Sequence, residues 1–279
     1  MKNIYTFGGF PATRNLTVAD IKANKMAGRK MTQVTSVNRN EAAACEEMGI
    51  DHLSIVAEDI HEVRAGAPNT FVTSAVMMSE HPTADDILRT AIAAAAAGSD
   101  AIYTPRGLRN VEMLAHEGLA VQGHLGLVPR KSTLVGGLRG IAKTADEAMT
   151  LMEDVRRLQD AGAYAVEMEC VAAEALTEIS KRTSLVTHSI GSGSGGDVIF
   201  MFMEDICGDV DNPPRHAKAF GRVGEIRKEL EAERRRALGA YGEAVKTGVF
   251  PDKATSIAMS AGEEDKLREA LDKWTTLHQ

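Results

Sequence analysis

Residues 144–169, TADEAMTLMEDVRRLQDAGAYAVEME, contain a helix, a turn and a strand in succession and decide the fold class. Thr144 and Glu147 have the spacing of a capping box, which marks the start of a helix. Gly162 ends this helix, because glycine readily takes the left-handed conformation that follows a helix C-terminus. A β-like run at 163–169 begins at once. Short joints of this kind are typical of parallel α/β sheets.

The same joint recurs along the chain, as Gly-Ile-Asp at 49–51 and Gly-Ser-Asp at 98–100. Strands are predicted at 30–36, 51–57, 70–76, 100–103, 119–124, 163–169, 185–190 and 197–203. Helices are predicted at 38–48, 83–97, 108–117, 144–161 and 172–182. Eight strands alternating with helices predict a closed (β/α)8 TIM barrel. A doubly wound open sheet is the alternative.

We expect a single barrel domain over residues 1–279, with the barrel at about 16–210 and a helical extension at about 215–250. The sequence at 224–247 is rich in Glu and Arg and predicts a long helix. This helix either packs in an oligomer or presents a solvated, salt-bridged surface.

The composition is that of a globular chain: 44% of the 279 residues are hydrophobic and the net charge is -7. The acidic balance argues against nucleic acid and anionic membranes as partners. The longest apolar run, 91–97, is too short to span a bilayer. The N-terminal residues do not resemble a signal peptide, and Cys45, Cys170 and Cys207 form no CxxC pair. We therefore expect a cytoplasmic protein with reduced thiols.

Two acids end the strand 163–169. Side chains alternate along a strand, so Glu167 and Glu169 share one face. Acids are costly to bury, and a neighbouring acid raises the pKa of one of them toward that of a general base. We predict that Glu169 is catalytic and that Glu167 contacts the substrate. A structural acid paired with a lysine is the alternative.

Other polar residues lie at or after predicted strand ends, where TIM barrels place their chemistry. His124 can polarise a carbonyl or bind a metal, or it is a structural histidine. Tyr103 and Arg106 can stabilise an oxyanion, and Arg106 can hold a carboxylate, although surface arginines are usually only solvated. Ser36 follows the first strand and is a candidate for substrate binding.

Two loops suggest binding of ions. Glu58, Asp59 and His61 suit a hard divalent cation, but their spacing matches no standard site and loop acids are usually solvated. The glycine-rich loop after residue 190 contains Ser192 and Gly193, whose backbone amides can hold a phosphate or carboxylate. A tight barrel-closing turn is the alternative for this loop.

The chain resembles the ketopantoate hydroxymethyltransferase (3-methyl-2-oxobutanoate hydroxymethyltransferase) family of the phosphoenolpyruvate mutase/isocitrate lyase superfamily. The resemblance runs from about residue 16 to about residue 251. The most specific stretches are GHLGLVP at 123–129, DAGAYAVEMECV at 160–171 and IGSG at 190–193.

The resemblance implies a (β/α)8 barrel, commonly decameric, that catalyses an aldol-type transfer. A base removes the proton next to the ketone of 3-methyl-2-oxobutanoate. A magnesium-bound enolate then attacks the one-carbon unit of methylenetetrahydrofolate. Glu169 matches the position of the family's base, and His124 matches its strand-five histidine.

The chain departs from the family where the family binds metal. The Asp-Ser pair after the second strand is replaced by Ala57 and Glu58, and the second metal aspartate by Ala75. The Lys and Glu that end the fourth strand are replaced by Tyr103 and Pro105. Magnesium binding would need new ligands, for which Glu58, Asp59 and His61 are the candidates.

We therefore expect a diverged enzyme of this family that makes or breaks a C–C bond next to a carbonyl or carboxylate. Its substrate is a small-molecule carboxylate, Glu169 is its base, and it forms a homo-oligomer. One alternative is the family reaction itself, with a rebuilt metal site and methylenetetrahydrofolate. The other alternative is a catalytically inactive barrel that binds a ligand.

Overall fold

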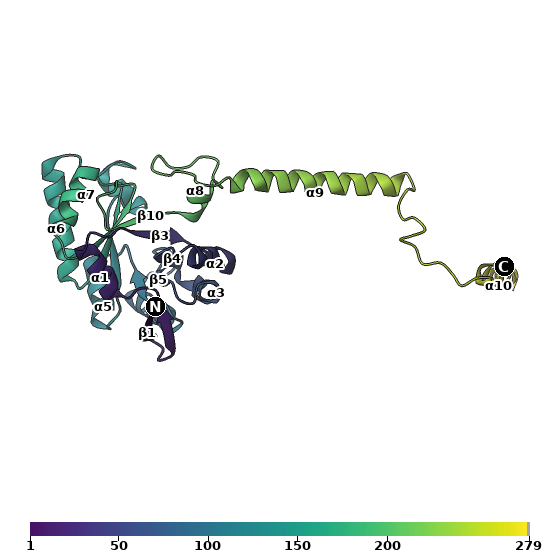
Figure 1. Ribbon diagram of the computed structural model, residues 1–279, viewed down its shortest axis with the longest axis horizontal. Helices are drawn as coiled ribbons and strands as arrows, with labels where there is room; N and C mark the ends of the chain where they lie inside the picture. The colour runs from purple at the N-terminus through teal and green to yellow at the C-terminus, as the bar shows by residue number, and fades with distance from the viewer. Residues whose placement is uncertain (278–279) are drawn as a thin grey trace. The chain divides into compact units, whose positions relative to one another are not determined.

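The structure, a computed structural model, describes residues 1–277 (Figure 1). The chain divides into two compact units, Met1–Arg222 and a second unit that begins at Val223. Each unit is described by itself.

The first unit is a closed barrel of eight parallel strands in the order β10-β3-β4-β5-β6-β7-β8-β9. The strands are β3 (Met31–Thr35), β4 (His52–Val56), β5 (Phe71–Ala75), β6 (Ala101–Tyr103), β7 (Val121–Gly126), β8 (Ala165–Glu169), β9 (Val186–Ile190) and β10 (Val198–Met201). Each overlaps a strand that the sequence predicts. The (β/α)8 barrel is therefore confirmed, and the open doubly wound sheet is excluded because β10 pairs with β3.

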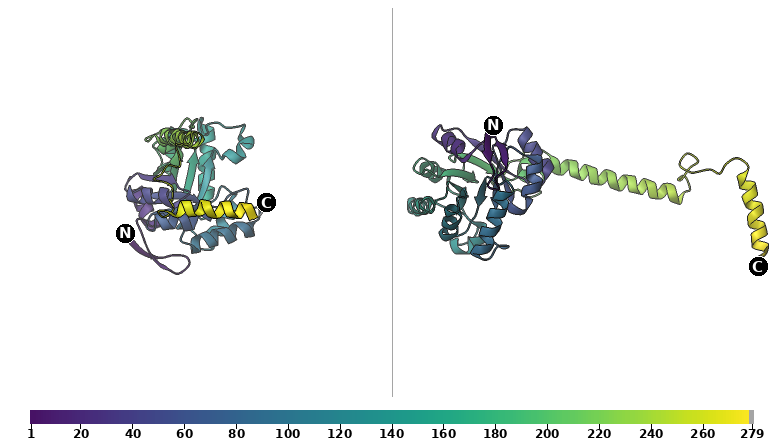
Figure 2. Two further views of the ribbon diagram at one scale, coloured as in Figure 1. Left: turned by 90° about the vertical axis from the view of Figure 1, so that its right-hand side faces the viewer. Right: turned by 90° about the horizontal axis from the view of Figure 1, so that it is seen from below.

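Helices surround the strands in each view (Figures 1 and 2). They are α1 (Val18–Met26), α2 (Arg39–Glu47), α3 (Ile60–Gly66), α4 (Ala84–Ala96), α5 (Leu108–His116), α6 (Ala145–Asp160), α7 (Ala173–Ser180) and α8 (Met203–Cys207), with 3-10 turns η1 (Ala57–Asp59) and η2 (Pro129–Val135). The Thr144 side chain accepts a hydrogen bond from the Glu147 amide at 3.2 Å, which is one half of the predicted capping box. The side chain thus satisfies an amide that helix geometry leaves free. The Glu147 carboxylate accepts from the Lys143 amide at 2.9 Å and not from the Thr144 amide, so the box is incomplete.

Several elements of the first unit are absent from the sequence-based prediction. Strands β1 (Lys2–Tyr5) and β2 (Pro11–Arg14) form an antiparallel hairpin outside the barrel. Helix α1 begins after Thr17, whose side chain forms a complete capping box with Asp20. Helix α3 follows η1 in the run that we interpreted as a metal-binding loop.

Apolar side chains fill the space between strands and helices. One cluster packs β6, β7 and β8 against α4–α7, and a second packs β3, β4 and β5 against α2 and α3. Gly123 lets α6 approach β7 closely, since a Cβ there would lie 2.6 Å from a methyl carbon of Leu158. This packing fixes β7 and β8, which carry the acidic end of the barrel.

The second unit contains α9 (Val223–Lys246) and α10 (Glu263–Leu277), drawn in green and yellow in Figure 2. The sequence predicts the first of these helices almost to the residue, at 224–247. None of the described helices combines the length and the apolar character needed to cross a membrane.

Candidate active site

Two acids and a histidine meet at the C-terminal ends of β7 and β8. His124 is the register partner of Glu167, and Gly126 is the partner of Glu169. The His124 Nδ1 atom lies 3.6 Å from Glu167 Oε1, and its Nε2 atom lies 3.3 Å from Glu169 Oε2. The imidazole therefore bridges two carboxylates that the strand alternation places on one face, as the sequence predicts.

Burial shapes the electrostatics of this trio. Burial raises the pKa of Glu167 to about 7, an effect that His124 opposes and Glu169 reinforces. Burial by itself would lower the pKa of His124, but the charges of Glu167 and Glu169 and the hydrogen bonds to Glu169 and the Leu127 carbonyl raise it overall. The site thus holds exchangeable protons near neutral pH, as a general acid–base centre requires.

Tyr103, at the end of β6, completes the centre. Its hydroxyl lies 2.5 Å from His124 Nδ1, while His124 Nε2 lies 3.1 Å from the Leu127 carbonyl oxygen. A carbonyl only accepts, so Nε2 carries a proton. Burial, and then the charges of Glu167 and Glu169, raise the pKa of Tyr103 well above its usual value, which keeps the phenol protonated.

The backbone around Glu169 is held by close contacts. Gly126 has φ +84°, and a Cβ there would collide with the Glu169 carbonyl oxygen. The Leu127 amide donates to the same oxygen at 2.8 Å. Cys170 follows with φ +51°, an uncommon conformation for a residue with a side chain. These contacts turn the chain sharply directly after Glu169 and so fix the place of its side chain.

The glycine-rich loop takes part in this support. The Ser192 hydroxyl donates to the Met168 carbonyl at 2.7 Å and accepts from the Val171 amide at 2.8 Å. The Gly193 carbonyl accepts from the Ser189 hydroxyl at 2.6 Å. These bonds are those of a tight turn that braces β8. A substrate contact by Ser192 or Gly193 stays a prediction.

A largely apolar cavity of about 310 Å³ opens at the same end of the barrel. It lies at the ends of β3, β4, β5 and β10, and its lining includes Ser36, Ile55, Ala75, Met77 and Phe200. Ala75 is the register partner of Tyr103, so the cavity adjoins the strand that carries the tyrosine. The Ser36 hydroxyl donates to the Asn38 carbonyl at 3.3 Å.

Basic side chains tie the loops above this end together. Arg106 donates through Nη2 to the carbonyls of Met78 at 2.6 Å and His81 at 2.5 Å, so it holds the loop after β5. Its Nε atom is buried with no hydrogen-bond partner among residues 1–277. Arg130 binds the Ser79 hydroxyl at 2.9 Å, and its charge acts on Tyr103, lowering that residue's pKa against the larger raising effects.

The predicted metal ligands do not come together. Among the described residues, Glu58 groups with Glu80 and His81, with one ligand atom from each within 4.8 Å of the others, while Asp59 and His61 belong to no such group. The run forms a 3-10 turn and then α3, so successive side chains point in different directions. The structure thus does not group Glu58 with Asp59 and His61, and metal binding by these three residues stays a prediction.

A second group of possible metal ligands is His124, Glu167 and Glu169 itself. Sequence reasoning had overlooked Glu80 and His81, although they lie in a loop that follows a barrel strand, which was the available signal. It had also overlooked a set of polar residues inside the barrel, Gln33, His52, Gln122 and His188, which are buried.

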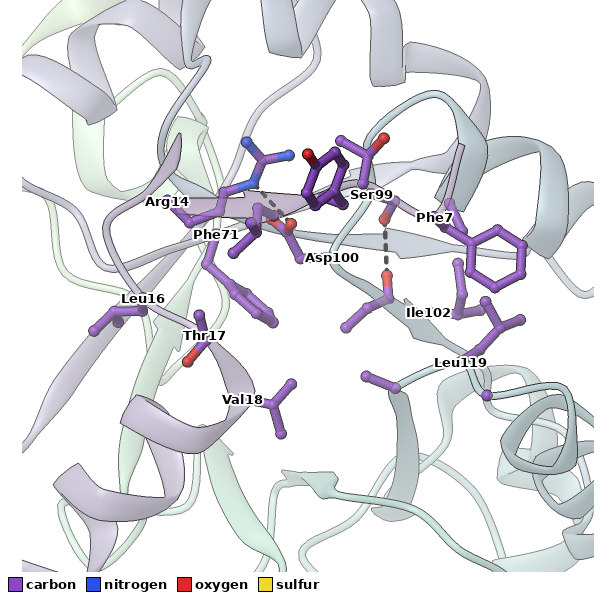
Figure 3. Close-up of a pocket in the computed structure, with 17 residues that line it drawn as sticks. Phe7, Arg14, Leu16, Thr17, Val18, Phe71, Ser99, Asp100, Ile102 and Leu119 are labelled. Carbon is purple, nitrogen blue, oxygen red and sulfur yellow. Dashed lines mark hydrogen bonds and ion pairs between the residues drawn. The ribbon is translucent and has the colours of Figure 1, made fainter. Parts of the chain in front are cut away.

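A further cavity of about 300 Å³ lies at the opposite end of the barrel, where the strands begin (Figure 3). Hairpin residues such as Phe7, together with Phe71 and Leu119, line it. Arg14 pairs with Asp100 at 2.7 Å beside it, and Arg64 pairs with the same carboxylate at 2.5 Å. Its charged groups thus satisfy one another. TIM-barrel chemistry resides at the other end, where the acids are.

Comparison with known proteins gives a consistent result. The model of the ketopantoate hydroxymethyltransferase family matches residues 56–253. The 3-methyl-2-oxobutanoate hydroxymethyltransferase of Hyperthermus butylicus is 29% identical over 92% of this chain and 96% of its own. That of Pyrobaculum aerophilum is 30% identical over 79% of this chain and 91% of its own.

Among solved structures, a protein from Burkholderia cenocepacia J2315 that was provisionally assigned as a phosphonomutase has a similar fold. It superposes with a TM-score of 0.54 at 10% identity, over 79% of this chain and all of its own. At this identity the similarity concerns the fold alone.

Proposed function

The chain belongs to the ketopantoate hydroxymethyltransferase family, and from this premise we propose that it makes or breaks a C–C bond next to a carbonyl or carboxylate, with Glu169 as general base. Family membership makes it an enzyme of the transferase or lyase type. The observation that carries the proposal is the bridging of Glu167 and Glu169 by His124, at the same end of the barrel as an apolar cavity.

Glu169 is better placed than Glu167 to reach a substrate. The Glu169 side chain is 15% exposed and lies at the very end of β8, whereas the Glu167 side chain is 8% exposed and lies one layer deeper. A base at this position takes a proton from the carbon next to the carbonyl, and the electron pair moves onto the carbonyl oxygen. The resulting enolate then forms the C–C bond. In the reverse direction, breaking the C–C bond yields the same enolate.

Tyr103 and His124 are suited to the negative charge that develops on that oxygen. When the imidazole is neutral, Nδ1 accepts the tyrosine proton, because Nε2 already carries one. When the imidazole is protonated, Nδ1–H donates to the tyrosine oxygen, which frees the hydroxyl proton to bind the enolate. Such donors are usually the largest catalytic contribution to reactions of this kind.

The surroundings support a small carboxylate with an apolar body as substrate. The apolar cavity accepts the body, and Arg106 and Arg130 supply positive charge on the adjacent loops. The 2-oxo acid 3-methyl-2-oxobutanoate, the compound in the names of the relatives, has these features and is the first compound to test.

Proton exchange at C3 of 3-methyl-2-oxobutanoate in D₂O, followed by proton NMR, tests the proposal. We expect the C3 signal to disappear with the wild-type protein. Glu169→Gln should slow the loss by at least about 10²-fold, the usual contribution of a general base. Glu174→Gln, an exposed acid on α7, is the control and should exchange at the wild-type rate. Undiminished exchange in Glu169→Gln would exclude Glu169 as the base.

A second candidate is the family reaction with a rebuilt metal site, which the grouping of Glu58, Glu80 and His81 favours. Two carboxylates and an imidazole fit a divalent cation, and Mg²⁺ bound there would polarise a carbonyl oxygen. The one-carbon donor would then be methylenetetrahydrofolate. This candidate requires exchange to stop after chelation, to return with Mg²⁺ and to weaken in Glu80→Gln. Exchange that survives chelation rules it out.

Absence of exchange with or without Mg²⁺, in a folded protein, would instead favour a barrel that uses another substrate or binds a ligand without turnover. Assembly of several copies also belongs to our proposal. Helix α9 has an exposed apolar face formed by Ile226, Leu230, Leu238, Tyr241 and Val245. Such a face in a 24-residue helix favours packing against a second copy.

A further inference from the structure

Four polar side chains lie inside the barrel, below the strand-end acids. Gln33, His52, Gln122 and His188 are all at most 1% exposed. The residues next to three of them in the sequence, Val34, Leu53 and Val121, pack outward against the helices. Because side chains alternate along a strand, the polar side chains face inward. We call these four residues the interior polar cluster.

Contacts between distant strands show that the side chains of the cluster meet in the barrel interior. His188 on β9 and Gln33 on β3 are separated by β10, yet His188 Nδ1 lies 2.5 Å from Gln33 Oε1. The rings of His52 and His188 also approach each other, with centroids 5.5 Å apart, although β4 and β9 are not neighbours. Gln33, His52 and His188 therefore meet in the barrel interior.

Most polar atoms of the cluster have no hydrogen-bond partner within the described part of the chain. They are both ring nitrogens of His52, Nε2 of His188, Nε2 of Gln33, and both Nε2 and Oε1 of Gln122. A buried polar atom without a partner destabilises the folded protein, because it loses its hydrogen bonds to water. Six such atoms inside one barrel carry a large penalty unless a bound partner satisfies them.

The donor and acceptor pattern identifies the chemistry of that partner. His188 donates a hydrogen bond from Nδ1 to Oε1 of the Gln33 side chain. This leaves Nε2 of His188 as an acceptor and the side-chain NH₂ group of Gln33 as a donor. The Gln122 side chain offers a donor group and an acceptor group, and the neutral ring of His52 offers one donor and one acceptor nitrogen. Burial lowers the pKa of His52 to about 4 and that of His188 well below its usual value, so both are uncharged. A neutral set of mixed donors and acceptors matches water, whereas a cation would need acceptors alone.

The cluster is continuous with the catalytic end of the barrel. His188 is the register partner of Glu167 on β8, and Glu167 is in turn the partner of His124 on β7. Gln122 lies two residues before His124 on the same face. Partners in adjacent strands are about 5 Å apart, so water beside His188 also reaches Glu167.

We propose that the barrel interior binds a cluster of ordered water molecules, held by Gln33, His52, Gln122 and His188, that hydrates Glu167 from below. This site does not depend on the reaction that the enzyme catalyses. Buried waters of this kind make two to four hydrogen bonds each and are structural parts of a protein.

A crystal structure of the wild-type protein at about 1.5 Å resolution tests the proposal directly. We expect water oxygens within about 3.2 Å of His52, of His188 Nε2 and of the Gln122 amide. Direct bonds among the four side chains with no water between them would overturn the proposal. An anomalous peak of a metal ion at the same place would overturn it as well.

Oxygen-17 magnetic relaxation dispersion, which detects long-lived internal water in solution, gives a second test. We expect a signal from the wild-type protein that falls in His52→Leu and in Gln122→Met, and that is unchanged in His116→Leu, a control at the end of α5. Two interior variants are used in case one does not fold. A wild-type signal unaltered in folded interior variants would contradict the proposal.

The melting temperature of a variant distinguishes a barrel interior that contains water from one that does not. If water satisfies His52, then His52→Leu strands the remaining groups and lowers Tm, by about 2–8 °C. If the interior is dry, the same substitution removes two unpartnered atoms and raises Tm. A rise in Tm would therefore also count against the bound water.

Discussion

At the scale of single residues, Glu167 makes the stability of the fold depend on pH. Its pKa rises from an ordinary value near 4.5 to about 7 in the folded protein. A carboxyl group whose folded pKa is raised contributes stability that is fully present below the unfolded pKa. This stability is lost as the pH rises through the folded pKa. His124, whose pKa is also raised, acts in the same direction.

We therefore predict that the free energy of unfolding falls between about pH 4.5 and pH 8, by roughly 3 kcal/mol at most from Glu167. Urea titrations at a series of pH values, with a chelator present, measure this fall. Glu167→Gln should remove most of it, whereas Glu174→Gln on α7 should leave it unchanged. A wild-type protein that becomes more stable toward pH 8 would contradict the assignment.

At the scale of elements, the contact between β7 and β8 depends on Gly126. Gly118 and Gly126 both have positive φ, of +81° and +84°. Nothing lies within 4 Å of a Cβ built on Gly118, whereas a Cβ on Gly126 meets the Glu169 backbone. Substituting Gly118 therefore measures only the free-energy cost of the backbone conformation. Substituting Gly126 measures that cost together with the cost of the collision with β8.

We predict that Gly118→Ala lowers the free energy of unfolding by about 1–2 kcal/mol, the cost of the left-handed conformation. Gly126→Ala should cost at least about 1 kcal/mol more, because the backbone of β8 must move. Only Gly126→Ala should also reduce the rate of C3 proton exchange, since Glu169 moves with the strand. Equal losses of stability in the two variants would show that the collision is relieved elsewhere.

Sequence patterns predict the elements well where local signals agree with the fold. Thr144, Glu147 and Gly162 bound α6 almost to the residue, because caps act through neighbouring backbone groups. The alternation at 165–169 places Glu167 and Glu169 on one face, as found. Such signals are local, so they survive in any tertiary context.

What the sequence did not reveal depends on contacts between distant segments. Glu58 meets Glu80 and His81 only because the loops after β4 and β5 lie side by side in the barrel. The Gln33–His188 contact crosses the barrel interior and joins residues 155 positions apart. Ser192, a candidate substrate ligand from its loop, also bonds the backbone of β8. No local pattern encodes these pairings.

At the scale of the whole molecule, α9 lets us predict how copies of the chain associate. Light scattering after size exclusion should give a mass of several protomers at micromolar concentration. Leu230→Glu and Tyr241→Glu place charges on the exposed apolar face of α9 and should shift the mass toward the monomer. Arg235→Glu, on another face of the helix, should not. A monomeric wild-type protein would refute the assembly.

The acid–base residues and the apolar cavity lie on different strands of the barrel. His124, Glu167 and Glu169 stand on β7 and β8, while the apolar cavity is lined by the ends of β3, β4, β5 and β10. On the proposed function, we expect substitutions at Ile55, Met77 or Phe200 to change which substrates enter without disturbing proton transfer, whereas Ala75 adjoins Tyr103. In evolutionary terms, the proposed function assigns selectivity and reactivity to separate strands. On that proposal, a lineage or a laboratory selection can exchange one substrate for another while the acid–base residues stay in place.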